Sequence, residues 1–309
     1  MGGGLSERPM ELVLKTSGQK CLVGSNPTPS ANETRHPFVA EECNKSERPY
    51  CRRMYSKTER DMPVFTAHNV LLRDGTRTLA GVIPMEEHPW MRQVRAILEI
   101  IYPGDKAELS VVDLGCLEGG YAVEFARMGF KTLGIEVRPE NIACCEFVKT
   151  ESDLPNLSFA QDTVWNFQNY GRFDVAFCSG LLYHLAFPKR FLEMVAASTR
   201  KVLFLQTHFS LTHELDTKFQ LSPLTLNEGL AGRWYQEAVE GRESDRWGSW
   251  ENDKSFWIRR EDLLGVLQSL GFEIVFEQFD GAPERGLAQR LSEDYASSLR
   301  GTFVGIRRD

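Results

Sequence analysis

The sequence predicts an α/β fold built on a doubly wound, mostly parallel sheet. From Ser110 onward, apolar runs of strand length alternate with helical patterns, which is typical of a series of βαβ units. The run at 202–206 is apolar almost throughout, as expected for a strand whose two faces are both covered by helices. The chain has 309 residues, which suffices for one large domain or two ordinary ones.

The part of the chain before this series is polar. Residues 1–60 combine several prolines with no sustained period of two or 3.6 residues, so we expect an irregular arm. At 64–79, two apolar stretches flank Asp74-Gly75, a dipeptide that favours a hairpin turn. An N-terminal arm and hairpin are therefore expected to occupy residues 1–84.

The main domain is expected at 85–309. Its strands are expected at 111–114, 132–135, 157–160, 173–178, 202–206, 272–279 and 302–306. Its helices are expected at 89–101, 121–128, 139–149, 188–198 and 260–270. The pattern is interrupted after the fifth strand, which indicates an insertion at about 208–258.

Composition limits the classes of function. Acidic side chains number 43 and basic ones 36, a formal charge of -7 that argues against a protein gripping nucleic acid by bulk electrostatics. No stretch approaches the roughly 20 apolar residues that cross a bilayer, and the first ten residues lack the apolar run of a signal peptide. We therefore expect a soluble, cytoplasmic protein without a membrane partner.

The cysteines fit the same compartment. They are seven in number and irregularly spaced, so we expect reduced thiols and not a disulfide framework. His36, Cys43 and Cys51 lack the tightly spaced cysteine pairs of a zinc site, and no metal is expected.

A glycine turn follows the first strand of the main domain. Residues 111–120 read Val-Val-Asp-Leu-Gly-Cys-Leu-Glu-Gly-Gly, and ligands of open α/β sheets bind at such carboxyl ends of strands. Leu117 stands where a dinucleotide-binding turn has its second glycine, which disfavours a pyrophosphate. Gly115 and Gly119 still permit close approach of a compact ligand, and the helix N-terminus offers amides to a carboxylate.

Acidic residues lie at the ends of successive strands. Asp113 and Glu118 add negative charge at the turn, which suits a cation better than a phosphate. Glu136 follows Gly115 by 21 residues and ends the second strand, where a carboxylate can accept hydrogen bonds from both ribose hydroxyls. Asp162, just after the third strand, can accept from the exocyclic amine of adenine. S-Adenosylmethionine joins an adenosine to an amino acid with a cationic sulfonium and would suit this set.

As a set, these motifs resemble the class I S-adenosylmethionine-dependent methyltransferases over residues 86–309. The matching segments are 111–120, Leu-Gly-Ile-Glu-Val at 133–137, Phe-Ala-Gln-Asp at 159–162, and Phe-Asp-Val-Ala-Phe-Cys-Ser-Gly-Leu-Leu-Tyr-His-Leu at 173–185. The resemblance implies a Rossmann-like, seven-stranded sheet whose last strand is antiparallel. It also implies S-adenosylmethionine as the cofactor.

The resemblance further implies roles for single residues. The first motif would hold the methionine part, the acid after strand two the ribose, the acid after strand three the adenine, and the fourth motif would line the methyl donor. The cofactor-binding residues expected on this basis are Asp113, Gly115, Cys116, Glu118, Gly119, Glu136, Asp162, Ser179 and Gly180. Leu117 departs from the family pattern, in which a third glycine is common, at a position that tolerates variation.

Two histidines are candidates for a general base, which a hydroxyl acceptor needs because its proton must leave. His208 directly follows the fifth strand and is favoured as the base, and His184 would shape the wall of the cofactor or acceptor site. A structural histidine held by hydrogen bonds is the alternative for each. In the insertion, Trp234, Tyr235 and Trp250 are expected to contact the substrate, or else to anchor the insertion to the domain.

The sequence thus predicts a methyltransferase that acts on a small-molecule acceptor, with oxygen favoured over nitrogen. The first alternative is an enzyme that modifies the wobble uridine of transfer RNA, because Gly-Leu-Leu-Tyr-His-Leu at 180–185 resembles such enzymes and residues 47–60 are basic. The second is a protein that binds S-adenosylmethionine without chemistry. A dehydrogenase is disfavoured by Leu117. The oligomeric state stays open.

Overall fold

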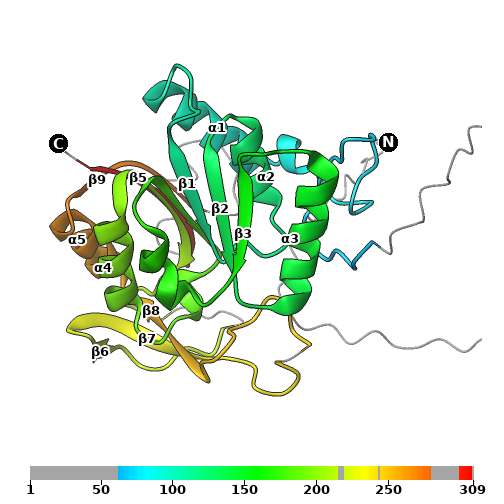
Figure 1. The fold of residues 1–309 in the computed structure, drawn as a ribbon. Coiled ribbons are helices and arrows are strands. Elements are labelled where there is room, and N and C mark those ends of the chain that lie inside the picture. Colours follow the sequence, from blue (N-terminus) through cyan, green and yellow to red (C-terminus); the bar gives the residue numbers. More distant parts are fainter. Residues whose placement is uncertain (1–61, 215–218, 243, 280–298, 308–309) are drawn as a thin grey trace, which may run out of the picture. The chain divides into compact units, whose positions relative to one another are not determined.

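The computed structural model describes residues 62–214, 219–242, 244–279 and 299–307 (Figure 1). They belong to one compact unit, Arg60–Asp309, whereas a second unit, Met1–Glu59, lies outside the described residues. The expectations for the arm, its basic stretch and its cysteines therefore also lie outside them. Because the compact unit begins at Arg60, the described residues 62–84 lie in the same unit as the residues that follow them, and the domain boundary expected at residue 84 stays a prediction.

The main sheet has seven strands in the order β3-β2-β1-β4-β5-β10-β9. The strands are β1 (Ser110–Leu114), β2 (Lys131–Glu136), β3 (Leu157–Gln161), β4 (Phe173–Ser179), β5 (Thr199–His208), β9 (Phe272–Phe279) and β10 (Arg300–Arg307). Strand β10 is antiparallel to both of its neighbours, and the pairs among β1 to β5 are parallel. The predicted mostly parallel, seven-stranded sheet is confirmed, and so is the antiparallel last strand.

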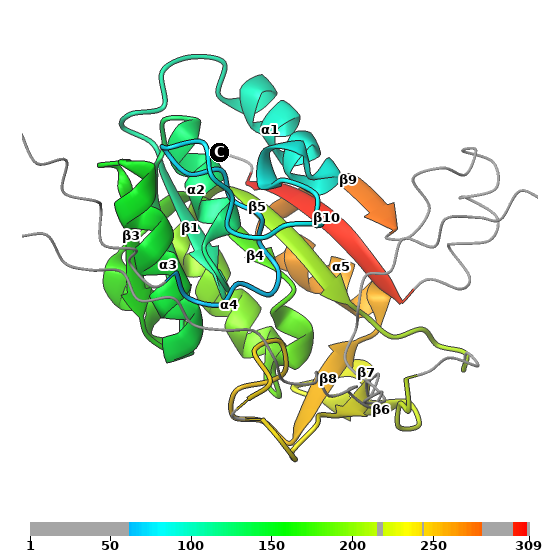
Figure 2. The same cartoon turned by 90° about the vertical axis from the view of Figure 1, so that its right-hand side faces the viewer.

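Helices cover both faces of this sheet. Successive side chains of β1, which point to opposite faces, pack against different helices. Val111 of β1 packs in one core cluster with residues of α1 (Pro89–Ile101) and α2 (Gly120–Arg127). Its neighbour Val112 packs in another cluster with residues of α4 (Pro188–Ser198) and α5 (Arg260–Ser269). Figure 2 shows α1 and α4 on opposite sides of the strands. This two-sided burial explains why the run at 202–206 is apolar on both faces.

The ends of the helices follow from local residue types. Proline is the first residue of α1, α3 (Pro139–Ser152) and α4, where its fixed φ fits the helix and its missing N–H is no loss. Helix α2 begins after Gly119, which has a left-handed conformation with φ 78°. Short 3-10 helices cover Met85–Glu87, Val164–Tyr170 and Leu182–His184. Among the helices in the described part of the chain, none is long and apolar enough to cross a bilayer.

The expected insertion folds into a second, three-stranded antiparallel sheet. Its strands β6 (Thr225–Asn227), β7 (Leu230–Gln236) and β8 (Lys254–Ile258) lie at one end of the main sheet, at the bottom of Figure 1. The sequence predicted the insertion but not these strands. Residues Phe256–Ile258 of β8 are almost fully buried in the cluster that also holds α4 and α5, so the insertion is part of the domain core.

Residues 62–84 pack against α2 and α3. The expected hairpin is reduced to a turn, in which Gly75 N donates to Leu72 O at 3.0 Å and a single antiparallel bridge joins Leu71 to Arg77. Phe65 and Leu72 are buried in a third cluster with side chains of α2 and α3. This segment thus has little strand pairing and packs against the helices.

Candidate functional site

The predicted glycine turn has three residues in the left-handed region of φ. Gly115, Leu117 and Gly119 have φ values of 70°, 52° and 78°. Leu117 therefore adopts the backbone conformation that glycine would adopt there, at some cost in strain for a leucine. Its N–H donates to Oε2 of Glu136 at 3.0 Å, which helps to fix this conformation. Leucine at this position is therefore compatible with a left-handed turn.

Glu136 lies where the sequence placed it, at the carboxyl end of β2. Its carboxylate accepts hydrogen bonds from the backbone N–H groups of Leu117, Val137 and Arg138 at 2.9 to 3.0 Å. Burial raises the pKa of Glu136, and these backbone donors act in the opposite direction. A carboxylate offers about four acceptor positions, so about one remains for a ligand hydroxyl.

Asp113 is buried at the end of β1, and its Oδ2 atom has no hydrogen-bond partner among the described residues. Burial, together with the nearby charge of Glu136, raises the pKa of Asp113 to about 8. The carboxyl is therefore protonated at neutral pH and can donate a hydrogen bond. An unsatisfied polar atom beside a glycine turn fits a polar ligand such as the amino acid part of S-adenosylmethionine.

We predict that Asp113→Asn removes part of the pH dependence of stability. Between an ordinary pKa of about 4 and about 8, folded Asp113 keeps a proton that the unfolded chain has lost. The free energy of unfolding should therefore fall as pH rises through this window, by up to about 4 kcal/mol between pH 5 and pH 8. Asparagine cannot ionise, so urea denaturation of the variant should show a smaller fall. Equal falls in both proteins would contradict a protonated Asp113.

The structure brings further predicted residues to the same edge. The N–H of Asp162 donates to Glu136 O at 3.1 Å, so these two acids are neighbours. The Asp162 carboxylate accepts from Thr163 N, Asn166 Nδ2 and Tyr170 OH within its own loop. Ser179 Oγ donates to Gln206 Oε1 at 2.8 Å, and Gly180 has φ 79°.

Two predicted residues point elsewhere. Cys116 is buried with its Sγ 3.8 Å from Sγ of Cys145, and burial raises the pKa of its thiol. Glu118 is fully buried, and its two oxygens accept from the backbone N–H groups of residues 66–68 and from the hydroxyl of Thr66. Glu118 therefore anchors the segment before α1, and neither side chain joins the candidate cofactor site.

His184 has a carboxylate partner that no sequence pattern indicates. Its Nδ1 lies 3.0 Å from Oε1 of Glu237, which comes just after β7 in the insertion. The Glu237 side chain is 4% exposed and that of His184 is 16% exposed. The two residues are 53 positions apart in sequence, and no motif connects them, so only the fold reveals the pair.

His208 lies at the end of β5 in an aromatic environment. Its ring stacks on Trp257 with centroids 4.5 Å apart and meets the ring of Tyr183 edge-on at 4.6 Å. Its Nδ1 lies 3.1 Å from the backbone oxygen of Leu299. Tyr183 also lies 4.2 Å from the ring of His184, so both histidines flank this tyrosine. A Cβ at Gly180 would be 3.8 Å from the Tyr183 hydroxyl, so Tyr183 also lies close to Gly180.

The three predicted substrate residues are separated. Tyr235 stacks on Trp257 at 5.1 Å and so shares the aromatic cluster of His208. Trp234 packs edge-on against Phe256. Trp250 is 43% exposed, and the Cζ atom of Arg138 lies over its ring, 5.0 Å from the ring centroid. Of these three aromatic residues, only Tyr235 belongs to the cluster that contains His208.

Hydrogen bonds hold the connection between β7 and β8 next to Glu136. Buried Arg138 donates to the backbone oxygens of Arg242 and Gly248 at 3.1 and 2.9 Å. Arg246 of the same connection donates to Oδ1 of Asn141 in α3 at 2.8 Å. These contacts place the insertion next to the residues at the carboxyl end of β2.

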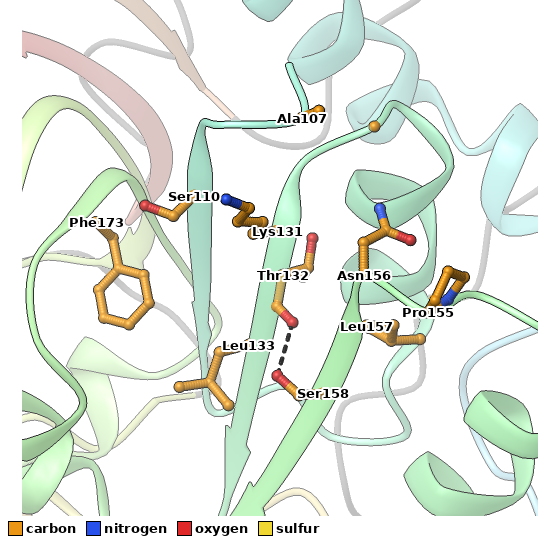
Figure 3. Close-up of a pocket in the computed structure, with 11 residues that line it drawn as sticks. Ala107, Ser110, Lys131, Thr132, Leu133, Pro155, Asn156, Leu157, Ser158 and Phe173 are labelled. Atoms are coloured by element: carbon orange, nitrogen blue, oxygen red, sulfur yellow. Dashed lines mark hydrogen bonds between the residues drawn. The ribbon is translucent and has the colours of Figure 1, made fainter.

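A groove of about 700 Å³ lies at the opposite edge of the sheet, where β1 to β4 begin (Figure 3). Its walls include Ser110, Lys131, Leu157 and Phe173, the first residues of these strands. The charge of Lys131 is paired with Glu108 at 2.8 Å. The groove contains none of the predicted site residues, and ligands of open α/β sheets bind at the other edge.

Comparison with known proteins gives the family. A family model described as a methyltransferase domain matches residues 86–277, more than half of the chain. The chain belongs to this methyltransferase family. Its fold and this match confirm the predicted S-adenosylmethionine-dependent methyltransferase, an enzyme whose cofactor is S-adenosylmethionine.

Similar proteins include one curated relative and solved structures. The ubiquinone biosynthesis O-methyltransferase of Rickettsia typhi is 24% identical over 126 residues, 41% of this chain and 49% of that protein. The chain therefore spans about half the length of this relative. The N-terminal domain of EvdMO1 with bound S-adenosylhomocysteine is 24% identical, with a TM-score of 0.53 over 72% of this chain and 82% of that one. With S-adenosylhomocysteine and D-fucose present, the same domain has a TM-score of 0.56 over 78% and 91%. These structures share the fold.

Proposed function

We propose that this methyltransferase transfers a methyl group to a hydroxyl of a small molecule. The observation that carries the proposal is the pair of imidazoles on either side of Tyr183, each with Nδ1 next to an oxygen acceptor. An imidazole that donates its Nδ1–H has its lone pair on Nε2 and can take a proton. A hydroxyl acceptor needs such a base because its proton must leave as the new bond forms.

The cofactor, when bound, supplies a methyl group on a cationic sulfonium. We propose that the turn at Gly115 and the protonated Asp113 hold its amino acid part, and that Glu136 accepts from the ribose with its remaining acceptor position. Asp162, whose backbone adjoins Glu136, would face the adenine amine. Ser179 and Gly180, beside Tyr183, would line the methyl group, and the insertion would exclude water from it.

Two observations support a small acceptor over transfer RNA. The cluster around His208 and Tyr235 is aromatic, and pockets for small organic molecules are lined mainly by hydrophobic and aromatic side chains. The curated relative is itself called an O-methyltransferase of ubiquinone biosynthesis.

The test is transfer of a labelled methyl group from S-adenosylmethionine to a cell extract, with small metabolites and RNA separated afterwards. We expect the label in the small metabolites, and no label with the Gly115→Val variant. Label in transfer RNA, decreasing steeply with added salt, would favour the RNA-modifying alternative. Binding of the cofactor in calorimetry with no label in either fraction would favour a protein that binds S-adenosylmethionine but transfers no methyl group.

A further inference from the structure

A buried carboxylate from the insertion lies against the histidine of the fourth motif. Oε1 of Glu237 is 3.0 Å from Nδ1 of His184, and the carboxylate is nearly inaccessible to solvent at 4% exposure. Placing a charge in such a position costs free energy unless the charge is paired and hydrogen-bonded. We propose that Glu237 is a positioning residue that orients His184 as the general base, so that the insertion completes the active site. The proposal rests on the O-methylation proposed above.

The carboxylate of Glu237 is itself fixed by the insertion. Ser255 Oγ of β8 donates to the same Oε1 atom at 2.6 Å. The backbone N–H of Glu237 donates to Asp253 O at 3.0 Å. Strands β7 and β8 are paired next to these residues, from Gly232 with Ile258 to Gln236 with Lys254. The paired strands therefore determine where the carboxylate points.

The backbone around His184 is held by the same insertion. The oxygen of His184 accepts from Ser249 Oγ at 3.2 Å and from Asn252 Nδ2 at 2.8 Å. The oxygen of Tyr183 accepts from Trp257 Nε1 at 3.1 Å. These contacts come from the β7–β8 connection and from β8. The insertion thus fixes both the ring and the backbone of the histidine, as preorganisation of a catalytic group requires.

A carboxylate accepts but cannot donate, so it selects the tautomer of His184 with a proton on Nδ1 and a lone pair on Nε2. In the reaction, the acceptor oxygen forms a bond to the methyl carbon while the carbon–sulfur bond breaks and its electron pair goes to sulfur. The hydroxyl proton passes to Nε2. Glu237 then balances the positive charge of the imidazolium. At His208, the residue predicted as the base, the partner of Nδ1 is a neutral backbone oxygen, which gives less compensation.

The test uses Glu237→Gln, a change that keeps the side-chain shape and removes the charge. The amide NH2 can donate to Nδ1, which would move the proton of His184 to Nε2. We expect turnover to fall by at least about 100-fold, the contribution typical of a general base, with the affinity for S-adenosylhomocysteine unchanged. Glu251→Gln is the matched control, because Glu251 lies on the same connection, is exposed, and accepts a hydrogen bond from Trp165 Nε1 at 3.0 Å. It should keep wild-type turnover.

A second measurement needs no acceptor. In the full-length protein saturated with S-adenosylhomocysteine, 15N chemical shifts of the His184 ring should report the Nδ1–H tautomer in the wild type and the Nε2–H tautomer in Glu237→Gln. A purely structural role of Glu237 would leave the tautomer unchanged, and that result would overturn the proposal. Wild-type turnover in the variant would also overturn it.

Two further variants separate this proposal from the function it rests on. His184→Ala should abolish turnover, whereas His208→Ala should retain part of it. The reverse order would return the role of base to His208 and overturn the proposal. If the wild type methylates no small molecule, the proposed function fails, whereas the tautomer measurement still decides whether Glu237 orients His184.

Discussion

Replacing Glu118 by alanine should lower the free energy of unfolding by about 3 kcal/mol, the range found when one partner of a buried charged network is removed. The carboxylate is completely buried and accepts from three backbone N–H groups in residues 66–68. Alanine would leave these N–H donors without an acceptor. The loss matters most for the N–H of His68, because His68 is buried. Arg246, with Nη2 at 3.5 Å, would lose its countercharge as well.

Urea denaturation followed by tryptophan fluorescence measures this loss, and amide hydrogen exchange localises it. Exchange should accelerate at residues 66–72 well before it does in β1 or β4. Glu108→Ala is the control, because Glu108 pairs with Lys131 while its side chain is 90% exposed. Such a surface pair contributes little, and the control should unfold like the wild type. A wild-type unfolding curve for Glu118→Ala would show that Glu118 does not anchor the segment.

The role of Glu118 illustrates what the glycine motif can and cannot predict. The position of Gly115 and Glu136 follows from the motif, because a strand, a tight turn and a helix leave few geometries for the chain. The partners of Glu118 are about fifty residues earlier, in a segment without regular secondary structure. No local pattern connects the two. The sequence thus predicted a charge at the turn but could not show which way it points.

His68 shows the same limit. Its Nδ1 accepts from Gly120 N, the first residue of α2, at 2.9 Å, and burial lowers the pKa of His68 to about 4. A neutral histidine therefore caps α2 in place of the usual serine or aspartate. Because this contact joins distant parts of the chain, it could not be predicted from the residues next to α2.

The main sheet was predictable for a physical reason. Strands covered on both faces consist almost only of apolar residues, and the fully buried Phe177 of β4 and Leu205 of β5 belong to two such runs. The insertion has no such signature, since β7 carries Arg233 and Gln236 beside its aromatic residues, and the apolar run of β8 is only Phe256–Ile258. Its strands, and with them the position of Glu237, emerge only from pairing between distant segments.

Replacing Gly115 by valine should abolish measurable binding of S-adenosylhomocysteine, at least a 100-fold loss that corresponds to about 2.7 kcal/mol. Gly115 has φ 70°, a conformation that a β-branched residue adopts only at high cost. A Cβ there would also lie 3.3 Å from Cδ1 of Leu181, closer than an ordinary contact. The turn must therefore change, and with it the N–H of Leu117 that bonds Glu136.

Gly75→Val is the matched control for this experiment. Gly75 has φ 86°, so valine introduces the same kind of backbone strain, but a Cβ there meets nothing within 4 Å. Both variants should lose stability, and circular dichroism will show whether they are folded at the temperature of the titration. Only Gly115→Val should lose binding in calorimetry, because only its turn lies between β1 and the carboxylate of Glu136. Equal affinities in the two variants would mean that the cofactor does not use the turn at Gly115, and the ribose role proposed for Glu136 would then lose its structural basis.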